Sequence, residues 1–469
     1  MGTTEKCLEV ASLFALIALF QKAYDVCLMA VNRYVVLLIS LFCMCLIFAN
    51  TLLFSFTVIC MDPIDNNVNN TDHKPLLTKT EEGLLFSGVA FAAIPSMFVT
   101  VALINRIGLR LTFFFFGLLS GIATLLMPLS TVNMYLALIG SALTSMCAAQ
   151  GTVPAKLGRP TQLGFLVALF ACIYELAPIM TMTLSSYLCT SPFGWQGVYY
   201  TFGPVTIFAF FVFLILYPTD RNRVTVMPET TSTVEIVETV ESPEKSISYG
   251  KILKTPLVWG LWLSGVGLAA EVQVIDMFGP TFTNKVLHFD VSTTGLLSGI
   301  SFALSICVKL SGGIVLDRIT CVSARAKTVS FTLITQAGTA LCFLILSFLT
   351  QYPDYAVFAQ ALFMLTILLF GLHTVGLFSG YQQAGGQSSD FLLSVFAVIN
   401  STTSLILPQI LTLITPNNTG KEWSALFFGI GIYVVVTGAA CVLLSMVRTG
   451  NKRNTVMDIQ KVTELSVDA

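Results

Sequence analysis

The chain has 469 residues, of which 55% are hydrophobic and only 10% are charged, and its formal net charge is −1. A soluble domain usually carries about 25% charged residues, so this composition, with a mean hydropathy of +0.83, excludes an ordinary soluble protein. The near-zero net charge argues against nucleic acid as a partner. The 12 cysteines fall mostly within apolar runs and form no CxxC pair, which favours packing roles, although Cys60 and Cys189 could meet on one side of a membrane.

Long apolar runs alternate with short polar segments along the chain. A backbone in hydrocarbon must satisfy its own hydrogen bonds, and about 20 helical residues cross a core ~30 Å thick, so each long run predicts a membrane-spanning α-helix. The short run 10–20 has no cleavage site after it, and we interpret it as an interfacial or unstructured segment. The predicted spans are 34–61, 84–104, 111–129, 134–153, 161–185, 198–217, 257–278, 292–316, 329–349, 355–378, 391–415 and 424–446.

A polar stretch, 218–256, divides these spans into two sets of six. The predicted fold is therefore an all-α membrane protein with twelve transmembrane helices in two six-helix bundles. Its expected parts are an N-terminal segment (1–33), a first bundle (34–217), a cytoplasmic linker (218–256), a second bundle (257–446) and a cytoplasmic tail (447–469).

The positions of Lys and Arg predict the orientation, because these residues are enriched on the cytoplasmic side. With both termini inside, 19 of the 24 fall in cytoplasmic segments and only four in outer loops. Two glycosylation sequons, at Asn69 and Asn417, then lie outside, where glycosylation occurs. A third sequon, at Asn400, lies inside a predicted helix and is expected to be unmodified.

The loops between helices 2 and 3 and between helices 8 and 9 carry a repeated motif. Residues 313–318 read GIVLDR, and residues 105–110 read NRIGLR, with Asn105 where an acidic residue is expected. This pattern resembles the G-x-x-x-D-R-x-G-R-R signature of the major facilitator superfamily, and an acid at a helix end can hold Arg across two bundles while an inner gate is shut. The alternative is an ordinary basic flank. The residues assigned to the gate motif are Gly313, Asp317, Arg318, Arg106, Gly108 and Arg110.

Shorter segments carry a narrower resemblance. They are NRYVVLL at 32–38, GWQGVYYTFG at 194–203, PTF at 280–282 with GLLS at 295–298, and EWSALF at 422–427. As a set they resemble the anion:cation symporter family, which includes sialin, the vesicular glutamate transporters and the sodium/phosphate cotransporters. The resemblance implies a symporter for organic anions or phosphate, driven by protons, sodium or voltage, without a bound cofactor.

Two positions depart from that family. Members that carry organic anions tend to have an Arg within helix 1 and another within helix 7. The corresponding positions here hold Thr51 and Leu268. An Arg fork binds both oxygens of a carboxylate, so the absence of both arginines argues against glutamate-like or sialic-acid-like transport.

Ionisable residues within predicted spans mark cavities or ion paths, since a buried charge is costly in a membrane. Glu175 and Glu271 each lie about 14 residues into their helices, and Asp276 lies near the outer end of helix 7. The hypothesis is that both glutamates line a central cavity and either couple transport to protons or bind a cationic group. In the alternative, Glu175 bonds a neighbouring helix and Glu271 faces water.

Three further polar residues have two interpretations each. Lys309 lies about 8 residues from the inner end of helix 8, where snorkelling to the surface is favoured over an anion contact that replaces the missing arginines. His373, placed near the inner end of helix 10, fits a packing histidine better than a proton relay. Asn400 belongs to a polar stripe on helix 11, which either lines the cavity or bonds helix to helix.

These features favour a multi-pass secondary transporter, in a plasma or endomembrane, that moves a small organic or inorganic ion by alternating access with protons or sodium. The alternatives are a non-transporting sensor or scaffold on the same fold and a facilitator for a neutral or cationic solute. An enzyme is not expected, because no HExxH, GxSxG or P-loop motif is present.

Overall fold

The computed structural model describes residues 35–61, 77–131, 172–217, 253–318, 324–385 and 389–447, and every long element within them is a helix. The first described helix is Val35–Met61. The other elements are α2 (Lys79–Leu126), the 3-10 turn η1 (Met127–Thr131), α6 (Ile173–Thr190), α7 (Gly194–Leu216), α10 (Pro256–Thr281), the π-helical turn η4 (Phe282–Val286), α11 (Val291–Arg318), α12 (Ala324–Leu349), the 3-10 turn η5 (Pro353–Tyr355), α13 (Ala356–Gly385), α14 (Ser389–Ile414) and α15 (Gly420–Met446).

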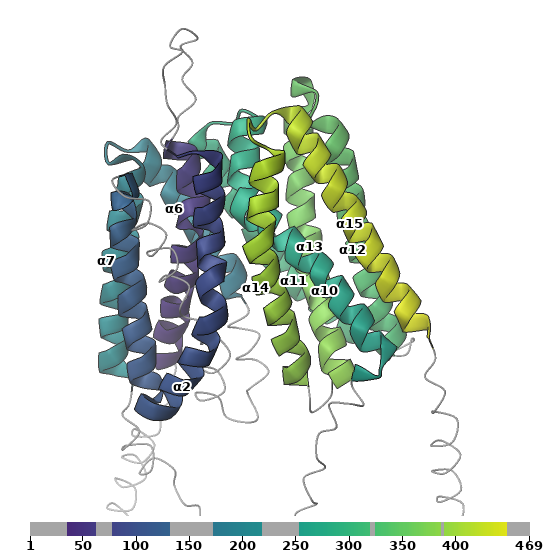
Figure 1. Ribbon diagram of the computed structural model, residues 1–469, viewed down its shortest axis with the longest axis horizontal. Helices are drawn as coiled ribbons and strands as arrows, with labels where there is room; N and C mark the ends of the chain where they lie inside the picture. The colour runs from purple at the N-terminus through teal and green to yellow at the C-terminus, as the bar shows by residue number, and fades with distance from the viewer. Residues whose placement is uncertain are drawn as a thin grey trace, which may run out of the picture.

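The described helices form two groups that lie side by side (Figure 1). We call the helix Val35–Met61 with α2, α6 and α7 the N-terminal bundle, and α10 to α15 the C-terminal bundle. Nine helices in the described residues are long and apolar enough to cross a membrane. The prediction of an all-helical membrane protein is therefore confirmed. The predicted span 134–153, the start of the span 161–185, the segment 10–20 and most of the linker and tail lie outside the described residues.

The predicted helices 2 and 3 both lie within the element α2, which is two helices joined at Gly108, with φ 82° and ψ 164°, so the expected loop is a tight turn. Glycine adopts such a positive φ without steric cost, so the chain turns within a single residue. Helix α13 continues to Gly385, seven residues beyond the predicted end, because its polar last turns still satisfy the backbone as a helix.

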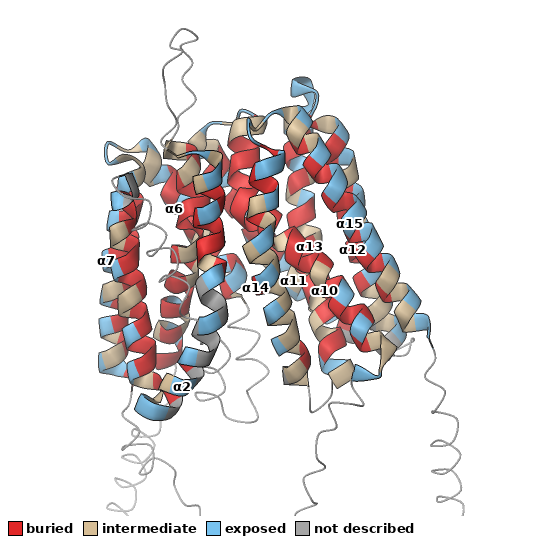
Figure 2. Cartoon of the chain, in the orientation of Figure 1, coloured by how far each residue is buried: buried red, intermediate tan, exposed pale blue. Residues whose placement is uncertain are grey.

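Large apolar side chains cover the outside of the molecule as well as its core. Phe208, Ile215 and Leu413 are 71%, 76% and 79% exposed, which suits contact with lipid rather than water. Figure 2 shows that buried residues follow one side of most helices. In the C-terminal bundle, the rings of Phe282 and Trp423 lie 5.3 Å apart in a fully buried aromatic cluster.

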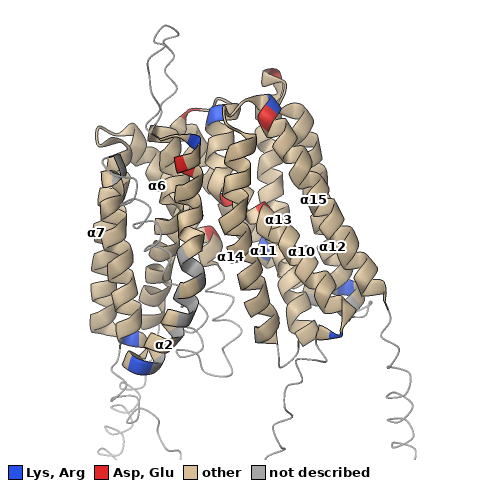
Figure 3. Cartoon of the chain, viewed as in Figure 1, with Lys and Arg blue, Asp and Glu red and all other residues tan. Residues whose placement is uncertain are grey.

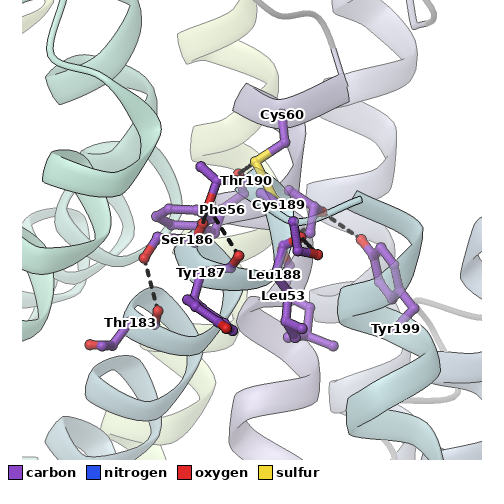
Figure 4. Close-up of a disulfide and its surroundings, with 12 residues drawn as sticks. Leu53, Phe56, Cys60, Thr183, Ser186, Tyr187, Leu188, Cys189, Thr190 and Tyr199 are labelled. Carbon is purple, nitrogen blue, oxygen red and sulfur yellow. Dashed lines mark hydrogen bonds between the residues drawn. A yellow bond between two sulfur atoms is a disulfide. The ribbon is translucent and has the colours of Figure 1, made fainter. Parts of the chain in front are cut away.

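A disulfide joins the first helix to α6 at one end of the N-terminal bundle (Figure 4). Its residues are Cys60 and Cys189, with Cα atoms 6.2 Å apart. One turn away, the Thr57 hydroxyl hydrogen-bonds the hydroxyl of Tyr199 of α7 at 2.7 Å. These contacts fix three helices of the N-terminal bundle together at what we call the disulfide end, the upper end in Figure 1.

The two bundles touch each other near the disulfide end along two seams. Between α2 and α14, the Ser87 hydroxyl donates to the Leu405 carbonyl at 2.9 Å and accepts from Gln409 Nε2 at 3.0 Å. Between α6 and α11, Gly295 lies so close to Ser186 that a Cβ at this glycine would overlap that side chain. The rings of Phe86 of α2 and Phe278 of α10, 4.8 Å apart, add a third contact between the bundles. We call these contacts the interbundle seal.

Candidate transport site

An ion pair joins the two bundles below the seal. Glu175 of α6 and Lys309 of α11, separated by 134 positions in the chain, form a salt bridge in which the Lys309 ammonium donates to Glu175 Oε1. The Glu175 side chain is 1% exposed and that of Lys309 is 18% exposed. At 1.5 Å per residue, Glu175 lies about 21 Å along α6 from Cys189, which places the pair deep within the span. Figure 3 shows how few charges lie away from the helix ends.

The favoured interpretation of Lys309 as a snorkelling side chain is wrong. A snorkelling lysine places its ammonium in water, whereas this ammonium contacts a carboxylate of the opposite bundle. In a low-dielectric medium the carboxylate and the ammonium attract each other, and each gives the other a partner that it would otherwise lack inside the span. The sequence alone did not predict the pairing, because it depends on how α6 and α11 lie across the bundle boundary.

Asp276 of α10 is a third ionisable group in the same region. Its side chain is 7% exposed, and both Glu175 and Lys309 interact with it electrostatically. Asp276 Oδ1 and Glu175 Oε2 have no hydrogen-bond partner among the described residues. The cluster therefore contains two carboxyl groups and one ammonium, with acceptor atoms available beyond the ion pair.

Glu271 does not join this cluster. It is fully buried, and its Oε2 lies 3.2 Å from Nδ1 of His373 of α13. His373 Nε2 lies 3.1 Å from the hydroxyl of Ser264. Ser264 in turn contacts Gln336, which contacts Thr437. The sequence alone did not single out these last three polar residues. The extension of α13 to Gly385 makes His373 a mid-helix residue, so its predicted position near the helix end is wrong.

The gate-motif residues lie near the opposite end of the bundles. Arg110 Nε and Nη2 donate to the Leu214 carbonyl at 3.0 and 2.5 Å, which ties α2 to α7 within the N-terminal bundle. Arg106 and Arg318 are exposed, and Gly313 has no atom within 4 Å of the position a Cβ would take. The Asp317 side chain lies outside the described part of the structure, so a gate across the bundles stays a prediction.

The remaining predicted positions fall in different surroundings. Asn400 is half-buried on α14, and the helix-to-helix bond of that stripe is made by Gln409 instead. Asn417 is exposed in the α14–α15 loop, where its Nδ2 donates to Glu422 Oε1 at 3.0 Å. Asn69 lies outside the described residues. The two positions of the missing arginines hold a buried Leu268 and a Thr51 whose hydroxyl donates to the Phe48 carbonyl at 2.7 Å.

The fold and the site define a multi-pass helical membrane protein with paired charges between two bundles. A model of the Major Facilitator Superfamily matches residues 37–408, most of the chain. The chain belongs to the Major Facilitator Superfamily, a family of transporters, and its curated relatives are those of the anion:cation symporter family.

Curated relatives match at low identity. Sodium-dependent phosphate transport protein 1 of Homo sapiens is 24% identical over 204 residues, which cover 41% of this chain and 44% of that protein. Sialin of Homo sapiens is 24% identical over 261 residues, covering 54% and 52%. Uncharacterized transporter slc-17.2 of Caenorhabditis elegans is 23% identical over 372 residues, covering 74% and 73%. The chain thus spans about half the length of the phosphate transport protein and of sialin.

Solved structures share the fold. A bacterial homologue of the human lysosomal transporter Spinster, in an inward-facing and unoccupied conformation, superposes with a TM-score of 0.62 at 14% identity, covering 88% of this chain and 97% of that one. A D-xylose–proton symporter gives a TM-score of 0.60 at 14% identity, covering 88% and 96%. At this identity the likeness establishes the architecture and no more.

Proposed function

We propose that the protein is a secondary active transporter that moves a small anion by alternating access, coupled to protons or sodium. The observation that carries this proposal is the ion pair between Glu175 and Lys309. It joins the two bundles deep in the span, and alternating access requires movement of one bundle against the other around a site at this depth. A charge pair across that boundary is made or broken by the movement.

Lys309 supplies the cationic group that an anion needs. An ammonium has three N–H donors, of which the salt bridge to Glu175 uses one. It is the partner with the more accessible side chain, 18% against 1% exposed. Neither Thr51 nor Leu268 carries a charge, and among the described residues Lys309 is the cation in the middle of a span. A phosphate or carboxylate bound at Lys309 would compete with Glu175.

The composition of the cluster sets the order of binding. With Glu175 and Asp276 both ionised, the cluster carries one excess negative charge, which repels an anion in a low-dielectric environment. A proton or sodium ion bound within the membrane span offsets that excess negative charge before the anion reaches Lys309. The cation therefore binds before the anion, and the two cross together. This order makes the transport a symport.

The interbundle seal closes the disulfide end in this conformation and must open in another step of the transport cycle. The contacts of Ser87 with Gln409 and of Ser186 with Gly295 hold the disulfide end together. In an alternating-access cycle these seams separate to expose the cluster from that side. Their small residues favour a tight contact that can slide without trapping large side chains.

We assign the disulfide end to the outer or lumenal side, with both termini cytoplasmic. The Lys and Arg distribution supports this orientation, and the Cys60–Cys189 disulfide supports it independently, because disulfides persist in oxidising compartments. The membrane is then the plasma membrane or an endomembrane vesicle or lysosome. Asn417, in the α14–α15 loop, falls on the same side, and the sequon at Asn69 is expected there.

Uptake into proteoliposomes tests the proposal. The full chain is offered phosphate, organic anions, organic cations and neutral solutes at two pH values, with and without sodium. Accumulation of an anion that depends on a proton or sodium gradient is the expected result. Uptake of cations or neutral solutes alone would favour a facilitator, and binding without uptake would favour a sensor.

A further inference from the structure

The buried chain of polar groups in the C-terminal bundle fixes how many protons it holds. It runs from Glu271 through His373, Ser264 and Gln336 to Thr437, and these side chains are between 0% and 6% exposed. Water does not reorient such groups, so each donor must face an acceptor. The proton positions then follow from one end of the chain to the other.

The far end has a single arrangement. The Val434 carbonyl can only accept, and it lies 3.3 Å from Gln336 Nε2 and 3.0 Å from the Thr437 hydroxyl. The hydroxyl proton of Thr437 is therefore used on Val434, and Thr437 accepts from Gln336 Nε2 at 3.0 Å. This fixes the Gln336 amide with its Oε1 toward Ser264.

The next link follows from that orientation. Gln336 Oε1 accepts only, so Ser264, 2.9 Å away, must use its one hydroxyl proton on it. Ser264 can then only accept from His373 Nε2, at 3.1 Å. His373 must carry a proton on Nε2.

The last link is between His373 Nδ1 and Glu271 Oε2, 3.2 Å apart. With Nε2 protonated, a neutral imidazole presents a lone pair at Nδ1, which repels a carboxylate and accepts from a carboxylic acid. An imidazolium instead donates to a carboxylate. In both cases one proton lies between the two residues and the pair is neutral overall. Glu271 Oε1 has no partner among the described residues, and an uncompensated buried charge there would be costly.

We propose that Glu271 and His373 form a single-proton site whose occupancy holds α10 against α13, and that this is the coupling proton of the transporter. Loss of the proton leaves a carboxylate facing a lone pair, so the contact must open. The proton count rests on the hydrogen bonds alone, whereas its role in coupling rests on the proposed function.

Other ionisable groups near α10 do not supply this proton. Tyr381 donates to the Leu261 carbonyl, and Lys309 is paired with Glu175. The hydrogen bond described for Glu271 comes from His373 alone. Away from the helix ends, the surrounding helices carry seven other titratable side chains that the structure describes. They are Asp276 (α10), Lys309 and Cys307 (α11), Cys342 (α12), Tyr381 (α13), and Tyr433 and Cys441 (α15). The side chain of Asp390 lies outside the described part.

Nitrogen NMR of the histidine ring tests the proton count directly. The chain has 3 histidines, so replacing His73 and His288 by Gln leaves His373 as the one labelled residue in full-length protein held in lipid nanodiscs. We expect a protonated Nε2 at every pH at which the protein is folded, as an imidazolium or as the neutral Nε2–H tautomer. A neutral ring protonated at Nδ1 would overturn the proposal, since it places a carboxylate on Glu271 and a net negative charge on the pair.

Two variants make the result specific. In Glu271→Gln, the amide donates to Nδ1, so the neutral Nε2–H tautomer is expected throughout; an imidazolium there would contradict the shared proton. In Ser264→Ala, the acceptor for Nε2 is lost and the Nδ1–H tautomer is expected to become populated; a spectrum like that of the wild type would contradict the network. Ser311→Ala, a surface hydroxyl on α11 that bonds within its own helix at 2.9 Å, is the matched control.

The coupling role has its own readout in the uptake assay. Glu271→Gln is expected to transport with a rate that no longer changes with pH, and pH-dependent uptake in this variant would overturn the coupling role. Absence of any uptake in the wild-type protein together with the expected NMR result would refute the proposed function and leave the single-proton site standing.

Discussion

Glu175 and Lys309 bridge the N-terminal and C-terminal bundles through one buried ion pair. Both belong to helices, α6 and α11, that also form one seam of the interbundle seal. The charge pair and the seal therefore report on the same movement, and a change in either one is expected to alter the relative position of the bundles.

Removal of one partner of the pair is expected to destabilise the protein. Glu175→Gln or Lys309→Met leaves the other charge without its partner inside the span, at a cost of about 3–5 kcal/mol for a buried pair. The double variant is expected to be much closer to the wild type, because it leaves no unpaired charge. Thermal unfolding in one detergent measures the four proteins as a double-mutant cycle. If the stability losses of the two single variants add up to that of the double variant, Glu175 and Lys309 do not stabilise each other, which contradicts the prediction.

Enlarging a seam residue is expected to open the disulfide end. A Leu at Gly295 overlaps Ser186, whereas Gly429 on α15 has no atom within 4 Å of its Cβ position. Gly295→Leu should reduce cross-linking between cysteines placed at Gly83 and Thr412, which face each other across the other seam. Gly429→Leu is the control and should leave the yield unchanged. Equal cross-linking yields in the two variants would show that the two seams do not open together, which contradicts the prediction.

Loss of the disulfide is expected to lower stability by about 2–5 kcal/mol, since the link closes a long loop between the first helix and α6. Cys60→Ser with Cys189→Ser removes it. The matched control is Cys307→Ser, which changes an exposed free cysteine. Thermal unfolding measures the loss of stability, and a non-reducing peptide map of the wild type checks the disulfide. Failure to find the peptide that contains linked Cys60 and Cys189 would contradict the assignment.

Asp290 is expected to give the start of α11 a pH-dependent stability. Hydrogen bonds from the Thr293 hydroxyl and N–H, 2.6 and 2.9 Å long, hold the pKa of the Asp290 carboxyl below its usual value. Stability from this carboxylate is present above the usual Asp pKa of about 4 and is lost as the pH falls through the lower folded-state value. Asp290→Ala should cost about 0.5–1 kcal/mol at neutral pH, given its exposure.

Asp290→Asn is the matched control, because Asn caps a helix without titrating. Its unfolding temperature, measured from neutral to acidic pH, should lack the part of the decline that Asp290 contributes. A decline identical to that of the wild type would assign the pH dependence to other groups.

Glycosylation tests the orientation. Asn417→Gln should remove a glycan from protein made in animal cells, seen as a shift in gel mobility that glycosidase treatment abolishes in the wild type. Asn400, in the sequon within α14, should never carry one. Modification at neither Asn69 nor Asn417 in a protein that reaches its membrane would count against an outward disulfide end.

Within the described residues, the sequence predicted where the long apolar helices lie, because hydropathy is a property of each run by itself. The same reasoning misplaced the end of α13, since the turns after Phe378 are polar and still helical, and this placed His373 at a helix end. It also missed the partners of Lys309 and His373. Those contacts join helices distant in the chain, and no local period encodes which faces meet. Gln336 and Ser264 gave a signal as polar residues within apolar runs, but that signal does not reveal their hydrogen-bond direction.

The most direct test of the transport account is anion uptake by the Lys309→Met, Glu175→Gln double variant. It is measured in proteoliposomes beside the wild type, with the anion that the wild type accumulates, and with folding checked by thermal unfolding. The account predicts a folded protein that has lost gradient-driven anion uptake, because the cation that holds the anion is gone. Uptake at the wild-type rate in this variant would contradict it.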